Sequence, residues 1–188
     1  MTTALFWFRK DLRLKDNLAW AKACEAHRIH PVFVLEPDLI SNAGLYRRQQ
    51  FFLNISALGS EIKSIGGKLS VIQGPAKDVL PRYIRENNID HIYFNADTTP
   101  FSRQRDEKLA KDLSIPINTF WSGLVHPPKT VLTQKGEISK VFTPFYKKWV
   151  TFPAPPSIQE SRPTFVDVQQ NTRDETQDLI PSTSNEGY

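Results

Sequence analysis

The sequence contains a single cysteine, Cys24, and only four histidines. One thiol cannot form a disulfide within the chain, which excludes a small secreted domain held together by disulfides. The histidines at positions 27, 30, 91 and 126 lack the spacing of a zinc site. We expect Cys24 to be a small, buried helix residue rather than a nucleophile.

Long apolar runs are also lacking. No segment approaches the ~20 consecutive apolar residues that a membrane-spanning helix needs. Met1 is followed closely by a strand-like segment, without the basic and then apolar leader of a secretory signal. With the single cysteine, this predicts a cytoplasmic protein that has no membrane partner.

Three glycine motifs of common α/β enzymes are absent from the sequence. They are GxGxxG after a strand, the phosphate loop GxxxxGK[ST] and the nucleophile elbow GxSxG. Their absence excludes the usual dinucleotide-binding Rossmann domain, the phosphate-loop enzymes and the α/β hydrolases. No catalytic residue and no metal site is predicted within this chain.

The sequence does contain a regular alternation of strand-like and helix-like segments. The apolar, strand-like segments are residues 5–8, 30–37, 68–74, 91–97 and 116–121. The segments of helical character between them are residues 17–27, 45–65, 75–87 and 100–113. This alternation predicts an α/β fold, a doubly wound five-stranded parallel sheet with helices on both faces.

The alternation stops after the fifth strand. Residues 130–143 predict a small hairpin around Gly136, and residues 143–150 a short aromatic helix or turn. Residues 151–188 hold five prolines and carry a net charge of −4, which leaves +8 for residues 1–150. We therefore expect one α/β domain over 1–150 and a Pro-rich, acidic, disordered linker over 151–188. The basic domain is compatible with a polyanionic partner and equally with solvated helix faces.

Polar side chains follow three of the predicted strands. Arg9, Lys10 and Asp11 follow the first strand, Glu36 and Asp38 the second, and Asn95 and Asp97 end the fourth. Ligands of doubly wound sheets bind outside the carboxyl ends of the strands, where the strand order reverses. These residues therefore predict a binding crevice at that edge.

The stretch WFRKDLRLKDN, residues 7–17, resembles the opening motif of DNA photolyases and cryptochromes. Four further stretches are similar to that family, in its order: PVFVLEP at 31–37, RQQF at 48–51, FNADTTPFSRQRD at 94–106 and TVLTQKGEISKVFTPFYKKW at 130–149. The resemblance covers residues 4–150 and is greatest to class I deoxyribodipyrimidine photolyase.

This resemblance implies the N-terminal α/β antenna domain of a two-domain protein. In the family, this domain holds a light-harvesting pigment, and a larger helical domain holds FAD and damaged DNA. The full-length family members are carbon–carbon lyases that split pyrimidine dimers with light. We expect the FAD-binding domain to lie outside this chain, so the isolated chain is predicted to be inactive and to meet damaged DNA only through that domain.

The resemblance also implies where an antenna pigment would bind. The residues that it assigns to the pigment pocket are Arg9, Asp11, Glu36, Asp38, Arg48, Phe51, Asn95, Asp97 and Asp106. Related folate-binding photolyases have an Asn-Glu pair where this chain has Phe101 and Ser102, so a deazaflavin, FMN or FAD is favoured over methenyltetrahydrofolate. Ordinary helix packing is slightly favoured over ligand contact for Phe51, and Asp106 is also explained by a cap or a pair with Arg103. An empty pocket is a further alternative, because cryptochromes often lack an antenna.

Four aromatic residues, Phe142, Phe145, Tyr146 and Trp149, gather near the end of the predicted domain. They either pack back on the sheet or form an exposed patch that favours self-association or meets another domain. The alternative function is a non-catalytic, cryptochrome-like regulator or remnant that binds a nucleotide or a protein partner. Direct DNA binding by the +8 domain is a third alternative, ranked last.

Overall fold

The computed structural model describes residues 1–37, 41, 43–158 and 161–166. Five strands form one sheet in the order β3-β2-β1-β4-β5, and every neighbouring pair is parallel. The strands are β1 (Thr3–Phe8), β2 (Arg28–Leu35), β3 (Ser70–Gln73), β4 (His91–Asn95) and β5 (Ile117–Phe120). The predicted fold class is confirmed.

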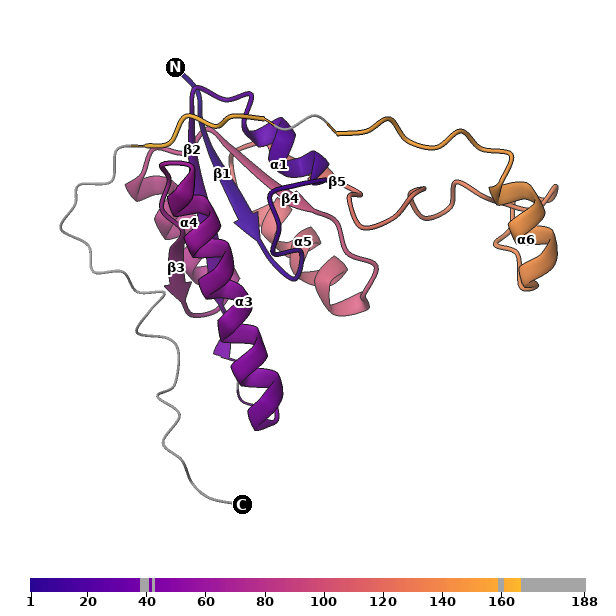
Figure 1. The fold of residues 1–188 in the computed structure, drawn as a ribbon, viewed down its shortest axis with the longest axis horizontal. Helices are drawn as coiled ribbons and strands as arrows, with labels where there is room; N and C mark the ends of the chain where they lie inside the picture. The colour runs from indigo at the N-terminus through magenta and orange to yellow at the C-terminus, as the bar shows by residue number, and fades with distance from the viewer. Residues whose placement is uncertain (38–40, 42, 159–160, 167–188) are drawn as a thin grey trace.

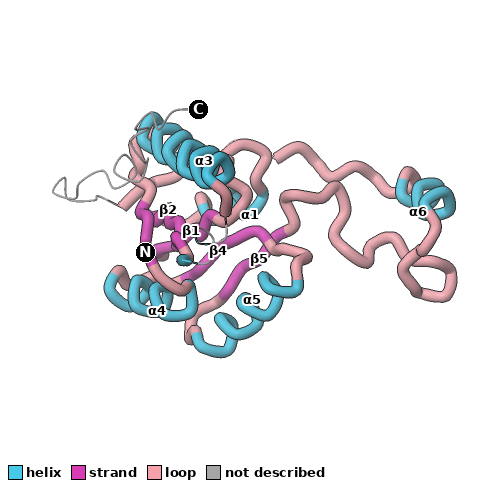
Figure 2. The backbone as a smooth tube through the Cα atoms, turned by 90° about the horizontal axis from the view of Figure 1, so that it is seen from below, coloured by secondary structure: helices cyan, strands magenta, loops and turns pink. Residues whose placement is uncertain are grey.

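Helices cover both faces of this sheet (Figure 1). They are α1 (Leu18–Ala23), α3 (Leu45–Ser64), α4 (Ala76–Glu86) and α5 (Pro100–Asp112). α3 lies on one side of the sheet, and α4 and α5 lie on the other (Figure 2). Helix α1 is shorter than predicted, because the chain turns after Cys24 to enter β2 at Arg28. Helix α4 is continuous through Pro81, which lies inside it.

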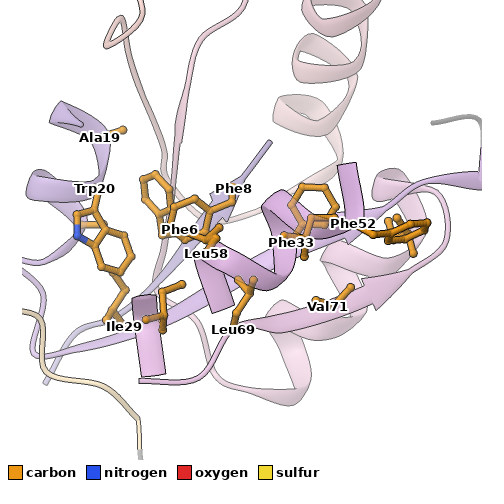
Figure 3. Close-up of a cluster of buried hydrophobic side chains, with 14 residues drawn as sticks. Phe6, Phe8, Ala19, Trp20, Ile29, Phe33, Phe52, Leu58, Leu69 and Val71 are labelled. Atoms are coloured by element: carbon orange, nitrogen blue, oxygen red, sulfur yellow. The ribbon is translucent and has the colours of Figure 1, made fainter. Parts of the chain in front are cut away.

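The central strand β1 contributes to both hydrophobic cores. Successive side chains of a strand point to opposite faces, so Phe6 and Phe8 pack in one core and Leu5 and Trp7 in the other. The first core lies between the sheet and helices α1 and α3, where Trp20 and Leu58 join Phe6 and Phe8 (Figure 3). The near-complete burial of β1 explains why its sequence reads as an apolar run without alternation.

The strand order places a reversal next to β1. From β1 the chain winds outward to β2 and β3, and it then returns to β4 on the other side of β1. The connections that follow β1 and β4 therefore lead to helices on opposite faces, which is where a doubly wound sheet binds its ligands. The fold thus brings residues after Phe8 and after Asn95 to one edge.

Beyond β5 the chain leaves the sheet and forms helix α6 (Phe142–Trp149) at a distance from it (Figures 1 and 2). An antiparallel bridge between Leu132 and Ile138 closes the predicted hairpin around Gly136. No residue of α6 is buried. The alternative in which the aromatic residues pack back on the sheet is therefore wrong.

The chain then returns to the sheet within the segment that was expected to be a disordered linker. The backbone amide of Ile29 in β2 donates to the carbonyl of Thr164, and Phe165 forms a parallel bridge with Ile29. Phe165 also packs against the core of α1 and α3. The expectation fails at 164–166 because β3 pairs with β2 only from Val32 onward, which leaves the backbone of Ile29 open to a partner. Residues 167–188 of the expected linker lie outside the described residues.

Helices long and apolar enough to cross a membrane are not found in the described part of the chain.

Candidate functional site

A pocket of about 180 Å³ lies across the carboxyl edge of the sheet. Its walls come from the ends of β1, β2 and β4, with Phe51 from α3 on one side and Phe101 and Arg105 from α5 on the other. The lining residues are Trp7, Phe8, Arg9, Lys10, Phe33, Val34, Glu36, Phe51, Asp97, Phe101, Ser102 and Arg105. Five of the twelve are aromatic, and five are charged. Such a surface suits a planar ring with a few polar substituents.

Arg9 joins the end of β1 to helix α5. Its Nη1 donates to both carboxylate oxygens of Asp106, at 2.7 and 2.9 Å, and its Nη2 donates to the backbone carbonyl of Asn95. The Arg9 side chain is 8% exposed and that of Asp106 is 19% exposed. Asp106 therefore neutralises a nearly buried cation, and it pairs with Arg9 rather than with Arg103.

Arg105 is the second cationic side chain in the pocket wall. Its guanidinium lies 4.6 Å from the centroid of the Trp7 ring and 5.7 Å from that of Phe101. It pairs with Glu36 at 3.5 Å and with Asp106 at 3.2 Å. Burial lowers the pKa of Arg105, and the charge of Arg9 lowers it further, while the two carboxylates oppose both effects.

A third ion pair joins Lys10 to Asp97, with 2.7 Å between Nζ and a carboxylate oxygen. Asp97 also accepts hydrogen bonds from the hydroxyl of Ser102 and the amide of Thr99, at 3.0 and 3.1 Å. Burial alone raises the pKa of Asp97, but the hydrogen bonds from Lys10, Thr99 and Ser102 outweigh it and lower that pKa. Asp97 is therefore ionised at neutral pH.

The charges that line the pocket are thus paired with one another. Arg9, Lys10 and Arg105 face Asp106, Asp97 and Glu36 within 4 Å. A ligand entering this pocket meets a balanced set of charges between aromatic walls. A group with a net negative charge finds no unpaired cation among these three.

Beside the pocket, a buried polar network fixes the loop after β1. Asn95 donates to the carboxylate of Asp11 and, at 2.9 Å, to the side-chain oxygen of Asn17. The hydroxyl of Ser122 donates to the side-chain oxygen of Asn95 at 2.6 Å and accepts from the amide of Leu18 at 2.9 Å. Asn17 also caps α1 by accepting from the amide of Trp20. In the described part of the chain, every buried side-chain nitrogen and oxygen has a partner.

The structure brings together some of the predicted site residues and separates others. Arg9, Glu36, Phe51 and Asp97 line the pocket, and Asp106 supports it through Arg9. Asp11 and Asn95 belong to the polar network instead. Arg48 is exposed and does not line the pocket. Asp38 lies outside the described residues.

Several pocket residues were missed by reasoning from the sequence. Trp7 and Phe33 lie inside the predicted apolar strands, and the structure shows that both belong to the cores and also reach the pocket. Arg105 and Phe101 lie four residues apart on α5, a spacing that places both on one helix face. That spacing, directly after the polar end of the fourth strand, was the available signal.

Two of the expectations from the sequence concern metal-ligating and thiol side chains. No cluster of three or more His, Cys, Asp or Glu side chains that could hold a metal ion occurs among the described residues. Burial raises the pKa of the Cys24 thiol to about 12. Cys24 therefore stays protonated at neutral pH, which agrees with its prediction as a packing residue.

Comparison with known proteins decides the family. The sequence profile described as DNA photolyase matches residues 4–162 of the 188. The chain belongs to the DNA photolyase family. The match therefore continues past helix α6 and ends just before Thr164 and Phe165, the residues that contact β2.

Among the relatives of this photolyase-family chain, an "uncharacterized 31.6 kDa protein" of Synechococcus sp. PCC 6716 is 33% identical over 155 residues, which are 79% of this chain and 55% of that protein. The deoxyribodipyrimidine photo-lyase of Synechococcus sp. PCC 6301 is 29% identical over 157 residues, 80% of this chain and 32% of that protein. The chain thus spans about a third to about a half of these curated relatives.

A solved photolyase from Sulfolobus tokodaii has the same fold, with a TM-score of 0.78 and 29% sequence identity. The match covers 95% of this chain and 42% of that one. It is described as containing two FAD molecules, with the implication of a novel light-harvesting cofactor. The narrower expectation of class I photolyase stays a prediction.

Proposed function

We propose that this chain is the antenna-pigment-binding part of a DNA photolyase and that the pigment binds at the carboxyl edge of the sheet. The observation that carries the proposal is the pocket between α3 and α5, with its aromatic walls and internally paired charges. A chromophore of this kind needs flat apolar contacts for its ring and a rigid frame that restricts its motion. In full-length members of the family, light-driven repair of pyrimidine dimers and the catalytic FAD that it requires belong to the helical domain.

We propose a tricyclic flavin-type pigment, either a deazaflavin or FMN/FAD, rather than methenyltetrahydrofolate. At the positions of the folate-binding Asn-Glu pair, Phe101 lines the pocket and Ser102 donates its hydroxyl to Asp97. Neither side chain offers a carboxylate to a pterin ring. The two FAD molecules of the Sulfolobus tokodaii photolyase support a flavin in a related chain.

The pocket has to widen to accept such a ring. Its volume of about 180 Å³ is below the roughly 300–1,000 Å³ of most small-molecule sites. Phe101 is 58% exposed, so its ring can turn outward without leaving a cavity in the core. We therefore place the opening of the site on the α5 side.

The proposal is tested by absorption titration of the purified chain with FMN, a deazaflavin and methenyltetrahydrofolate. We expect saturable binding of a flavin-type pigment with a shifted visible band, and at least tenfold weaker binding in Phe51→Ala, because about 1.5–3 kcal/mol of apolar contact is lost. Leu53→Ala, at a position of the same helix that is 50% exposed, is the matched control and should bind like the original chain. Binding of folate alone, or of no pigment, would contradict the proposal.

A second candidate is supported by helix α6. Phe142, Tyr146 and Trp149 stack in a row along it, with ring centroids 5.7 and 6.4 Å apart. Phe142 is 73% exposed and Tyr146 49%. We propose that this row is a protein contact, through which the isolated chain self-associates.

Sedimentation velocity over a range of concentrations tests this contact. The double substitution of Phe142 and Tyr146 by Ser should shift the chain to monomer without changing its melting temperature, because neither side chain is buried. Leu53→Ser controls for the loss of any exposed apolar residue. A chain that is monomeric at every concentration would exclude self-association.

A further inference from the structure

Trp7 occupies a chemically sensitive place in the proposed pigment site. It is 2% exposed and forms part of the pocket wall. Indole is among the side chains that lose an electron most readily, and an excited flavin is a strong oxidant. A flavin-type pigment bound here would supply photo-oxidation chemistry, and an unprotected Trp7 would be the electron donor to its excited state. The electron would then return to the indole, and the absorbed energy would be lost as heat.

The structure places two cations over the Trp7 ring. The guanidinium carbon of Arg105 is 4.6 Å from the ring centroid, and that of Arg9 is 5.2 Å from it. A neutral indole attracts a cation through its quadrupole. An indole radical cation repels it, so both guanidiniums favour the reduced ring and oppose its oxidation.

Both cations are held in place by carboxylates and are little exposed to solvent. Asp106 accepts hydrogen bonds from Arg9 and from Arg105, and Glu36 pairs with Arg105. The Arg9 and Arg105 side chains are only 8% and 18% exposed. In such surroundings a charge acts on a neighbouring ring more strongly than it does in water.

We propose that Arg9 and Arg105 keep Trp7 from donating an electron to the excited pigment. The two arginines thereby preserve the excited state for transfer of its energy. This inference rests on the proposed function, because it requires a flavin-type pigment in the pocket. It assigns Arg105 a role beyond ligand contact, because its charge opposes oxidation of the Trp7 indole beside the pigment.

Arg105 is the residue of choice for the test, because Arg9 also holds the backbone carbonyl of Asn95. The experiment compares the full chain with Arg105→Gln and Arg105→Lys, each saturated with FMN, by time-resolved fluorescence of the bound flavin. Gln removes the charge and keeps a planar polar group, whereas Lys keeps the charge. We expect Arg105→Gln to shorten the lifetime by about twofold or more, because a lost cation–π interaction of ordinary size changes a rate several-fold. Arg105→Lys should retain most of the original lifetime.

Trp7→Phe identifies the electron donor. In a chain that already carries Trp7→Phe, the further change Arg105→Gln should no longer shorten the lifetime. An unchanged lifetime in Arg105→Gln, an equal loss in Arg105→Lys, or a loss that persists without Trp7 would each overturn the inference and leave pigment binding intact. Absence of saturable FMN binding in the original chain would overturn the proposed function and this inference together.

Discussion

Arg9 and Asp106, 97 residues apart in the sequence, form a nearly buried ion pair that ties the end of β1 to α5. Asp106→Ala would leave the Arg9 cation without this partner. We expect the free energy of unfolding to fall by about 3 kcal/mol, near the lower end of the range for breaking a buried pair, since Asp106 keeps some exposure. Urea denaturation measures the change.

The exposed pair between Lys22 and Glu25 is the control for that substitution. Its side chains are 46% and 65% exposed, so Glu25→Gln should change stability by no more than about 0.5 kcal/mol. Equal losses in the two variants would mean that burial does not distinguish the pairs.

A second prediction concerns residues 164–166, which return to the sheet, and the contact of Phe165 with Gly67. A Cβ atom at Gly67 would lie 2.4 Å from Cε1 of the Phe165 ring. Gly67→Ala should therefore displace the ring and destabilise the chain by about 1–3 kcal/mol. In a chain that carries Phe165→Ala the same change should cost little, and this coupling is measured by a double-mutant cycle of urea denaturations.

Gly123→Ala is the control for that cycle, because a Cβ atom there meets nothing within 4 Å. If Gly67→Ala is equally harmless with Phe165 present, the returning segment does not lie on β2 in solution.

A third prediction is that Arg48 binds the phosphate group of the ligand. It is exposed on α3, one helical turn before the pocket residue Phe51, and no ion pair is found for it within the described residues. The charges inside the pocket are already paired, so a terminal phosphate should be bound outside, by Arg48. We expect Arg48→Ala to weaken FMN binding about tenfold and riboflavin binding hardly at all, since a charged hydrogen bond contributes about 1.5–3 kcal/mol.

Calorimetric titration of both flavins gives the two affinities. Arg82→Ala removes an exposed arginine from α4, which lies on the other side of the sheet from α3, and should leave both affinities unchanged. Equal weakening of FMN and riboflavin by Arg48→Ala would place Arg48 against the ring instead.

Asp97 predicts a pH dependence of stability. Its pKa in the folded chain is below the ordinary value of 3.8, so the folded state favours the ionised carboxylate. The resulting stabilisation is complete above the pKa of the unfolded chain and is lost as the pH falls from there through the folded pKa. Asp97→Asn should therefore destabilise by about 2 kcal/mol at pH 7 and by clearly less at pH 3.

Denaturant unfolding at the two pH values tests this, with Asp78→Asn on α4 as the comparison. A difference between the original chain and Asp97→Asn that stays constant from pH 7 to pH 3 would mean that the Asp97 carboxylate is not stabilised in the fold.

The fold could be predicted because its signals are local. The strands are short apolar runs, and Asn17 at the start of α1 and Pro100 at the start of α5 mark helix ends that the structure reproduces. All five strands end within two residues of their predicted bounds. The end of α1 was predicted less well, because it is fixed by the turn into β2 rather than by a capping residue.

The site could be predicted only in part, because its contacts are long-range. The strand ends indicated Arg9, Glu36 and Asp97. No local sequence signal indicates that Asp106 pairs with Arg9 or that Arg105 lies over the Trp7 ring. Asn95 was assigned to the ligand, and the structure commits it to Asp11, Asn17 and Ser122. The place of Phe165 was missed for the same reason, since its partner Ile29 lies 136 residues away.

The most direct test of the proposed pigment site is a two-dimensional ¹H–¹⁵N NMR titration of the labelled chain with FMN. Binding at the carboxyl edge of the sheet predicts that shifted amides cluster at residues 7–11, 33–36, 48–51 and 95–105. Amides of α6 and of the amino ends of the strands should not shift. Saturable shifts confined to α6 or to the opposite edge of the sheet, or no shifts at all, would contradict the account.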